Sequence, residues 1–142
     1  MMTWFTWALL SAFFAAMTAI LAKVGVAGVG SNLATAIRTS VVVVFTWLLA
    51  YITGEASGVQ LRSLAGRSWL FLFLSGLATG LSWLCYFHAL KIGPVSRVAP
   101  IDKLSVALVI LFSVVFLGER LTGHKALGGL LIVAGAVVIA LE

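Results

Sequence analysis

The stretch that decides the fold is Val95–Leu117, VSRVAPIDKLSVALVILFSVVFL. It is long enough to cross the hydrocarbon core of a bilayer as a helix, which takes about 20 residues. Its first half nevertheless carries a proline, an acid and a base, namely Pro100, Asp102 and Lys103. A charge at membrane depth costs about 2.5–3.5 kcal/mol on insertion scales, so such residues mark functional sites by default. We therefore expect the functional site to lie around this segment.

The composition of the whole chain also indicates a membrane protein. Of its 142 residues, 63% are hydrophobic and 9% are charged, whereas a soluble domain has about 25% charged residues. A folded chain of this length cannot bury this much apolar surface, and we therefore expect lipid to be its solvent. The formal net charge is +5, but the cations separate apolar runs and form no basic face. We expect no nucleic-acid binding, and anionic lipid head groups are the expected acidic partner.

Five apolar runs are long enough to span a membrane, and a helix is the open-chain structure that satisfies its own backbone in lipid. The predicted fold class is therefore all-α, an integral membrane protein with five transmembrane helices in one domain, residues 1–142. Ser31 and Asn32 predict the N-cap of the second span, and Gly54–Ser68 is the longest polar segment. The first run lacks the positive start of a signal peptide, so we expect it to be retained. The predicted spans are Trp4–Ala22, Ser31 to about Thr53, Trp69–Leu90, Val95–Leu117 and Ala126–Leu141.

The positive charges of the loops do not favour one orientation. Five spans place the two ends of the chain on opposite sides, and short loops rich in Lys and Arg face the cytoplasm. One reading is that the chain inserts both ways, which would allow an antiparallel pair of identical chains. The other is that one orientation wins by other means. The cations on the N-terminal side are Arg62, Arg67, Arg120 and Lys125, and those on the other are Lys23, Lys91 and Arg97, with Arg38 if it lies near the interface.

Two charged residues are predicted to lie at the same depth. Counted at about 1.5 Å per residue through a core of about 30 Å, Asp102 lies about 6 Å and Arg38 about 7 Å below the same surface. Tyr86 of the third span reaches the same layer. We expect Arg38 and Asp102 to pair directly or through water. The alternative is that Arg38 extends to the lipid head groups by itself.

The two charges of the fourth span are expected to face different ways. Asp102 and Lys103 are about 100° apart on a helix. The stripe of Asp102 is the more polar, so we expect it to face a cavity. Pro100 leaves the carbonyl of Ser96 without its donor and favours a kink. The Asp102 stripe contains Ser105, Val109, Phe112, Ser113 and Phe116, and the Lys103 stripe contains Ser96, Pro100, Ala107, Ile110 and Val114.

The third span carries small and aromatic residues at helical spacing. Gly76 and Gly80 form a small-xxx-small step, which indicates a close helix contact. Trp83 and Phe87 follow on the same face, with Tyr86 beside them. These rings either line a solute cavity or pack and anchor the helix at the interface.

Nothing in the sequence predicts an enzyme. There is no catalytic triad, no metal-ligand spacing and no phosphate-binding loop, so we expect no catalytic residues, no metal and no cofactor. Cys85 is the single cysteine, so no disulfide forms within the chain, and a buried apolar role is expected for it. His88 is expected at the interface, and Glu119 is expected to pair with Arg120 or Lys125.

The end of the chain resembles a known family. The stretches LGERLT, Leu117–Thr122, and LGGLLIVAG, Leu127–Gly135, are similar to the closing signature of EamA-type members of the drug/metabolite transporter superfamily. The Pro100 element and the segment Gly76–Leu90, which ends in YFHAL, fit the same pattern over essentially the whole chain. Most members have ten helices in two inverted five-helix repeats. The resemblance implies that this chain is one such repeat, and that a transporter is made from two chains, a homodimer, in an antiparallel arrangement.

The resemblance also implies a function. It implies export of small metabolites or drug-like solutes by alternating access, in a multi-pass protein of the cytoplasmic membrane of a prokaryote. Its partners would be a small-molecule solute, the lipid bilayer and a second copy of the chain. A central cavity lined by the first, third and fourth helices makes Trp83, Tyr86 and Asp102 candidates. The rival reading is a non-transporting membrane subunit that packs against or regulates a partner membrane protein.

One departure bears on the coupling of transport. The small multidrug resistance branch couples protons through a glutamate in its first helix, but the first span here has no acid. Asp102 is then the best proton carrier, whereas facilitated diffusion is favoured if Arg38 holds it ionised. Arg38, Lys103 and Asp102 together are net positive, which favours a solute with an anionic group. The candidate pathway residues are Asp102, Lys103, Arg38, Trp83, Tyr86, Pro100 and Ser105.

Overall fold

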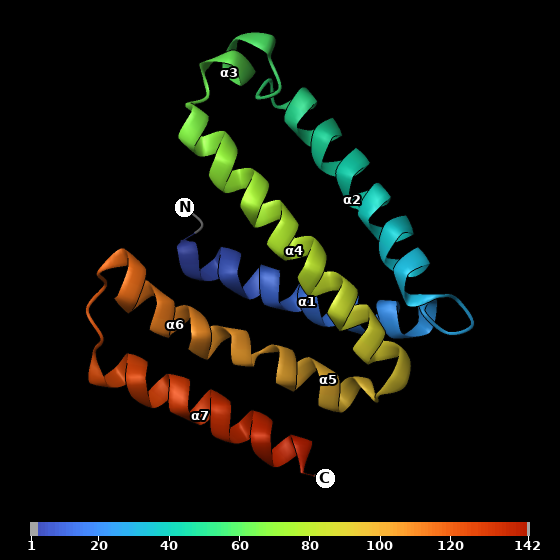
Figure 1. The fold of residues 1–142 in the computed structure, drawn as a ribbon, viewed down its shortest axis with the longest axis vertical. Coiled ribbons are helices and arrows are strands. Elements are labelled where there is room, and N and C mark those ends of the chain that lie inside the picture. The colour runs from blue at the N-terminus through green and yellow to red at the C-terminus, as the bar shows by residue number, and fades with distance from the viewer. Residues whose placement is uncertain (1–2, 142) are drawn as a thin grey trace. The chain divides into compact units, whose positions relative to one another are not determined.

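The computed structural model describes residues 3–141 and confirms the all-α fold class, with no strand in that range (Figure 1). Five helices are long and apolar enough to cross a membrane, and most of their large apolar side chains are exposed. Exposed apolar surface on every span is what a lipid solvent requires. The spans are α1 (Trp4–Gly25), α2 (Ser31–Ile52), α4 (Gly66–Ile92), the pair α5 (Val95–Asp102) and α6 (Leu104–Leu117), and α7 (Gly123–Ala140).

The chain forms two compact units, which we describe separately. The first, called the α5–α7 unit, comprises the described residues 3–23 and 92–141, and so also holds most of α1. The second, called the α2–α4 unit, comprises Val24–Lys91.

In the α5–α7 unit, α7 packs against both α5 and α6 and runs in the opposite direction (Figure 1). Gly129 of α7 is buried. A Cβ atom added there would lie 3.3 Å from Cδ1 of Ile110. The missing side chain therefore lets the backbone of α7 approach α6, which is how small residues drive helix association in lipid.

The fourth span is not one continuous helix. It is interrupted at Lys103, three residues after Pro100. The predicted kink at Pro100 itself stays a prediction. The N–H of Lys103 bonds the carbonyl of Pro100 at 3.1 Å, and the N–H of Val106 bonds the carbonyl of Lys103 at 3.0 Å. Both bonds link residues three apart, so the chain tightens into a 3₁₀-type turn there.

In the α2–α4 unit, the helices extend beyond some of the predicted ends. The helix α2 begins at Ser31, but the residue at the N-cap position is Gly30, without a side-chain cap. The Ser31–Asn32 cap prediction is wrong because Ser31 is already helical. The polar segment contains a short helix, α3 (Gly58–Ser63), with no hydrophobic period to predict it. The last turn of α4 includes Lys91 and Ile92, which lie beyond the predicted end of this span at Leu90.

Candidate solute pathway

The predicted pathway residues Arg38 and Trp83 meet in the α2–α4 unit. The guanidinium carbon of Arg38 lies 4.1 Å from the centroid of the Trp83 ring and 5.5 Å from that of Phe87. Trp83 and Phe87 are four residues apart on α4, so both rings lie on one face of the helix. Phe87 is 3% exposed, and Arg38 is half-buried. The aromatic face predicted from helical spacing is therefore the surface that contacts the cation of α2.

Phe87 was predicted to share this face but was not among the candidate pathway residues. Its spacing of four residues from Trp83 could have indicated that Phe87 belongs with the pathway residues. Its neighbour Tyr86 is half-buried, and their rings meet edge to face with centroids 6.5 Å apart.

The α2–α4 unit offers Arg38 no carboxylate. Its one acid is Glu55, which lies 17 residues further along the chain, or about 25 Å at helical rise. The hydroxyls next to Arg38 donate to the backbone of their own helix: Thr35 to the carbonyl of Ser31 at 2.9 Å, and Thr39 to that of Thr35 at 2.8 Å. The contacts of Arg38 described within this unit are thus aromatic.

Asp102 and Lys103 form an ion pair in the α5–α7 unit that was not predicted. Nζ of Lys103 lies 3.2 Å from Oδ2 of Asp102. The pair leaves both side chains partly exposed. Of the other candidates, Pro100 is half-buried within α5, and Ser105 is exposed in the first turn of α6.

The two stripes of the fourth span have different surroundings. Ala107, Ile110 and Val114, of the Lys103 stripe, line the contact with α7. Phe112 and Phe116, of the Asp102 stripe, are exposed. The helix α7 thus leaves the Asp102 stripe uncovered, and its facing a cavity stays a prediction. The pairing of Asp102 with Arg38 joins residues of different units and stays a prediction as well.

Two expectations for α4 are not met. A Cβ atom at Gly76 or Gly80 would meet nothing within 4 Å, so the α2–α4 unit contains no close helix contact at this step. Cys85 is exposed and has no buried apolar role in this chain. All three residues lie on a span whose surface is largely open, because few side chains of the unit cover it.

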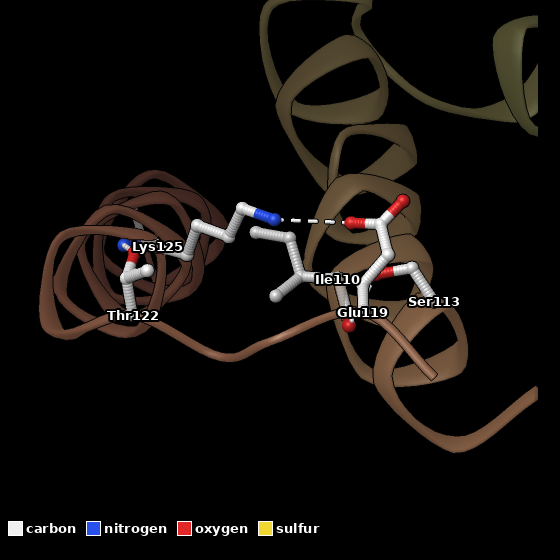
Figure 2. Close-up of polar contacts among 5 residues, drawn as sticks. All are labelled: Ile110, Ser113, Glu119, Thr122 and Lys125. Carbon is white, nitrogen blue, oxygen red and sulfur yellow. Dashed lines mark hydrogen bonds and ion pairs between the residues drawn. The ribbon is translucent and has the colours of Figure 1, made fainter. Parts of the chain in front are cut away.

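The corner between α6 and α7 shows what the LGERLT motif does physically. Gly118 has a φ of +67°, which ends α6 and lets the N–H of Glu119 return to the carbonyl of Ser113 at 3.1 Å. The carboxylate of Glu119 accepts from Nζ of Lys125 at 3.0 Å, so the pairing with Lys125 is confirmed (Figure 2). The hydroxyl of Thr122 accepts from the N–H of Lys125 at 3.3 Å and caps α7. This motif therefore joins the two helices.

An apolar groove of about 300 Å³ lies beside this corner, between α6 and α7. The stem of Lys125 lies at its edge, and the remaining lining is apolar. The lining residues are Ala107, Ile110, Leu111, Val114, Leu121, Ala126, Gly129, Leu130 and Val133.

Comparison with known proteins identifies the family. The EamA-like transporter family matches residues 2–141. This chain belongs to that family. It is also 52% identical over 138 residues to a Sinorhizobium sp. protein named an uncharacterized transporter in the cobO 3′ region, with 97% of this chain and 96% of the relative covered. No solved structure matches the chain.

This EamA family member is therefore a multi-pass membrane protein of a transporter family, and its five apolar helices are consistent with one five-helix half. The family implies a small-molecule solute and membrane lipid as partners, and it points to transport and not to catalysis. Among the described residues, no group of three or more His, Cys, Asp or Glu could hold a metal ion.

One contact of this EamA chain was not predicted. Nζ of Lys23 donates to the carbonyl of Gly93 at 2.7 Å within the α5–α7 unit. The carbonyls beyond a helix end need donors, and a lysine supplies one here. The sequence showed Lys23 only as a cation in the loop after the first span, so its bond to Gly93 could not be predicted.

Proposed function

We propose that two copies of this chain form one ten-helix transporter, an antiparallel homodimer. It exports a small metabolite or drug-like solute by alternating access across the cytoplasmic membrane of a prokaryote. Residues 1–142 form one five-helix domain, and the pathway contains Arg38, Trp83 and Asp102, with Tyr86 beside them. The remaining pathway residues are Pro100, Lys103 and Ser105.

The observation that carries this proposal is the odd number of spans combined with balanced loop charges. Five spans place the two ends on opposite sides of the membrane. The loops on the N-terminal side carry four cations and those on the other side carry three or four, so the loop charges favour neither orientation. Two such chains in opposite orientations would have the symmetry of inverted repeats, with a pathway between them.

The relative adds support. The match covers nearly all of both chains, so a protein of about this length bears the name of a transporter. The contact of Arg38 with Trp83 also supports a pathway on the α2–α4 unit, because a cation below the membrane surface faces the bundle or a cavity more often than lipid.

Labelling of single cysteines tests the orientation. After Cys85→Ser, a cysteine is placed at Ala27 or at Ala65, two exposed positions in links that lie on opposite sides of the membrane. We expect an impermeant maleimide added outside cells to label about half of each variant, since both orientations occur. Labelling of one variant in full and the other not at all would contradict the antiparallel dimer.

Flux through liposomes that contain only this chain tests transport itself. We expect saturable flux of at least one solute from a broad panel of small metabolites and drugs. No flux across the panel would favour the non-transporting subunit. Conductance without saturation would contradict alternating access.

A further inference from the structure

We propose that Arg38, held against Trp83, is the recognition site for the carboxylate of a small organic acid that this protein transports. The inference rests on the proposed function and names the solute class of the same pathway. It is carried by the contacts of one side chain and by the acids that are missing around it.

The first observation is the kind of contact that Arg38 makes. Its guanidinium lies over the ring of Trp83 and beside that of Phe87. Ring faces stabilise a positive charge, but they offer no oxygen acceptors to the five N–H donors of the group. The rings therefore hold the cation in place. Tyr86 also interacts with its charge, but none of these groups supplies a carboxylate to the guanidinium.

The second observation is the charge balance. Within the α2–α4 unit the single acid, Glu55, follows the far end of α2. Asp102, predicted at the depth of Arg38, already has Lys103 at 3.2 Å. Even if Asp102 also reaches Arg38, the three residues keep one net positive charge. A charge below the membrane surface is retained when it pairs with an opposite charge, so an external anion fits this layer.

The third observation concerns the shape of the anion. A guanidinium donates two parallel bonds to a planar carboxylate, which a single lysine cannot do. Phe87 adds apolar surface next to Arg38, and the ring of Tyr86 packs edge to face against that of Phe87. A carboxylate attached to a compact apolar group therefore matches the site. A lipid phosphate has the same oxyanion chemistry but comes from the bilayer, so the experiment must separate the two sources.

Fluorescence of Trp83 tests the proposal on the full chain in nanodiscs of zwitterionic phosphatidylcholine. Trp4, Trp7, Trp47 and Trp69 are replaced by Phe, so that Trp83 alone reports. The probes are benzoate and benzamide, which match in size and differ in charge. We expect a saturable change with benzoate and an apparent affinity for benzamide at least about tenfold weaker.

Variants connect the response to Arg38. We expect Arg38→Gln to abolish the benzoate response and Arg38→Lys, which keeps the charge without the fork, to weaken it about tenfold. Arg67→Gln is the matched control, because Arg67 also lies near a ring, 5.7 Å from that of Phe71, at the other end of α4. This control should respond to benzoate like the parent. If Arg38→Gln fails to fold, the comparison of benzoate with benzamide and the Arg38→Lys variant still test whether Arg38 binds the carboxylate.

Three outcomes would overturn the proposal. One is an equal response to benzoate and benzamide, and another is a benzoate response that survives Arg38→Gln. The third is an Arg38-dependent response to added phosphatidylglycerol with none to benzoate, which would assign the site to a lipid head group. Liposome flux of other solutes without benzoate binding would leave the transporter intact and reject this site. Benzoate binding without any flux would reject the transporter and keep the site.

Discussion

Arg38 shows how much of the cost of an intramembrane charge one contact can offset. A cation–π contact contributes about 0.5–2 kcal/mol, whereas the charge costs about 2.5–3.5 kcal/mol on insertion scales. The contacts with Trp83 and Phe87 therefore hold the side chain in place but leave part of the cost unmet. The remainder must come from an anion, either Asp102 or a solute, or from the lipid interface.

A charge swap tests whether Asp102 supplies that anion. If the two residues pair, Arg38→Asp or Asp102→Arg alone should lower the unfolding free energy in micelles by about 3–5 kcal/mol, because each leaves two like charges together. The double variant should recover most of this loss. Stability is measured by unfolding in a denaturing detergent. A double variant no more stable than the single ones would argue against the pair.

At the scale of elements, the two faces of α6 have different surroundings. One face of α6 packs on α7 through Ile110 and Gly129, whereas the Asp102 stripe stays uncovered. The Glu119–Lys125 pair joins the same two helices at their corner, but it is half-exposed. An exposed pair contributes about 0–1 kcal/mol, so helix packing must stabilise this contact more than the ion pair does.

Gly129→Leu tests that packing. A Cβ atom there already lies 3.3 Å from Ile110, so a full side chain should force α6 and α7 apart. We expect a loss of about 1–3 kcal/mol in unfolding free energy, the usual cost of overpacking. Gly128→Leu is the control, because nothing lies within 4 Å of its Cβ position, and it should cost clearly less. Equal losses would show that Gly129 is not the contact point.

At the scale of the whole molecule, the proposed dimer requires both orientations. Two added lysines on one side should make the chain insert one way only, through the charge bias of short loops. We make this change as Ala27→Lys with Asn32→Lys, and on the opposite side as Ala65→Lys with Ser68→Lys. Each variant alone should lose transport, because it has no partner of opposite orientation.

Co-expression of the two oriented variants should restore transport. Solute efflux from cells measures this, and a reporter fused to the C-terminus confirms the orientation of each variant. Transport by either oriented variant alone would show that a single orientation is sufficient.

Much of the fold could be predicted because it depends on local properties. The five apolar runs required lipid and hence helices, and the starts of the first two helices, Trp4 and Ser31, were predicted correctly. The short helix α3 was missed because it lies in a polar segment without hydrophobic periodicity. For the candidate site, the spacing of Trp83 and Phe87 predicted their common face, but not that Arg38 would meet it.

The sequence by itself determined the solvent, the number of spans and the residues that bring charge into the membrane, because hydrophobicity and backbone hydrogen bonding act along the chain. The tertiary structure alone decided which groups meet. It placed Arg38 on aromatic rings, Lys103 on Asp102, and the Lys103 stripe of α6 against α7. These contacts depend on how helices distant in sequence pack and on where the backbone breaks at Lys103, and neither follows from helical spacing alone.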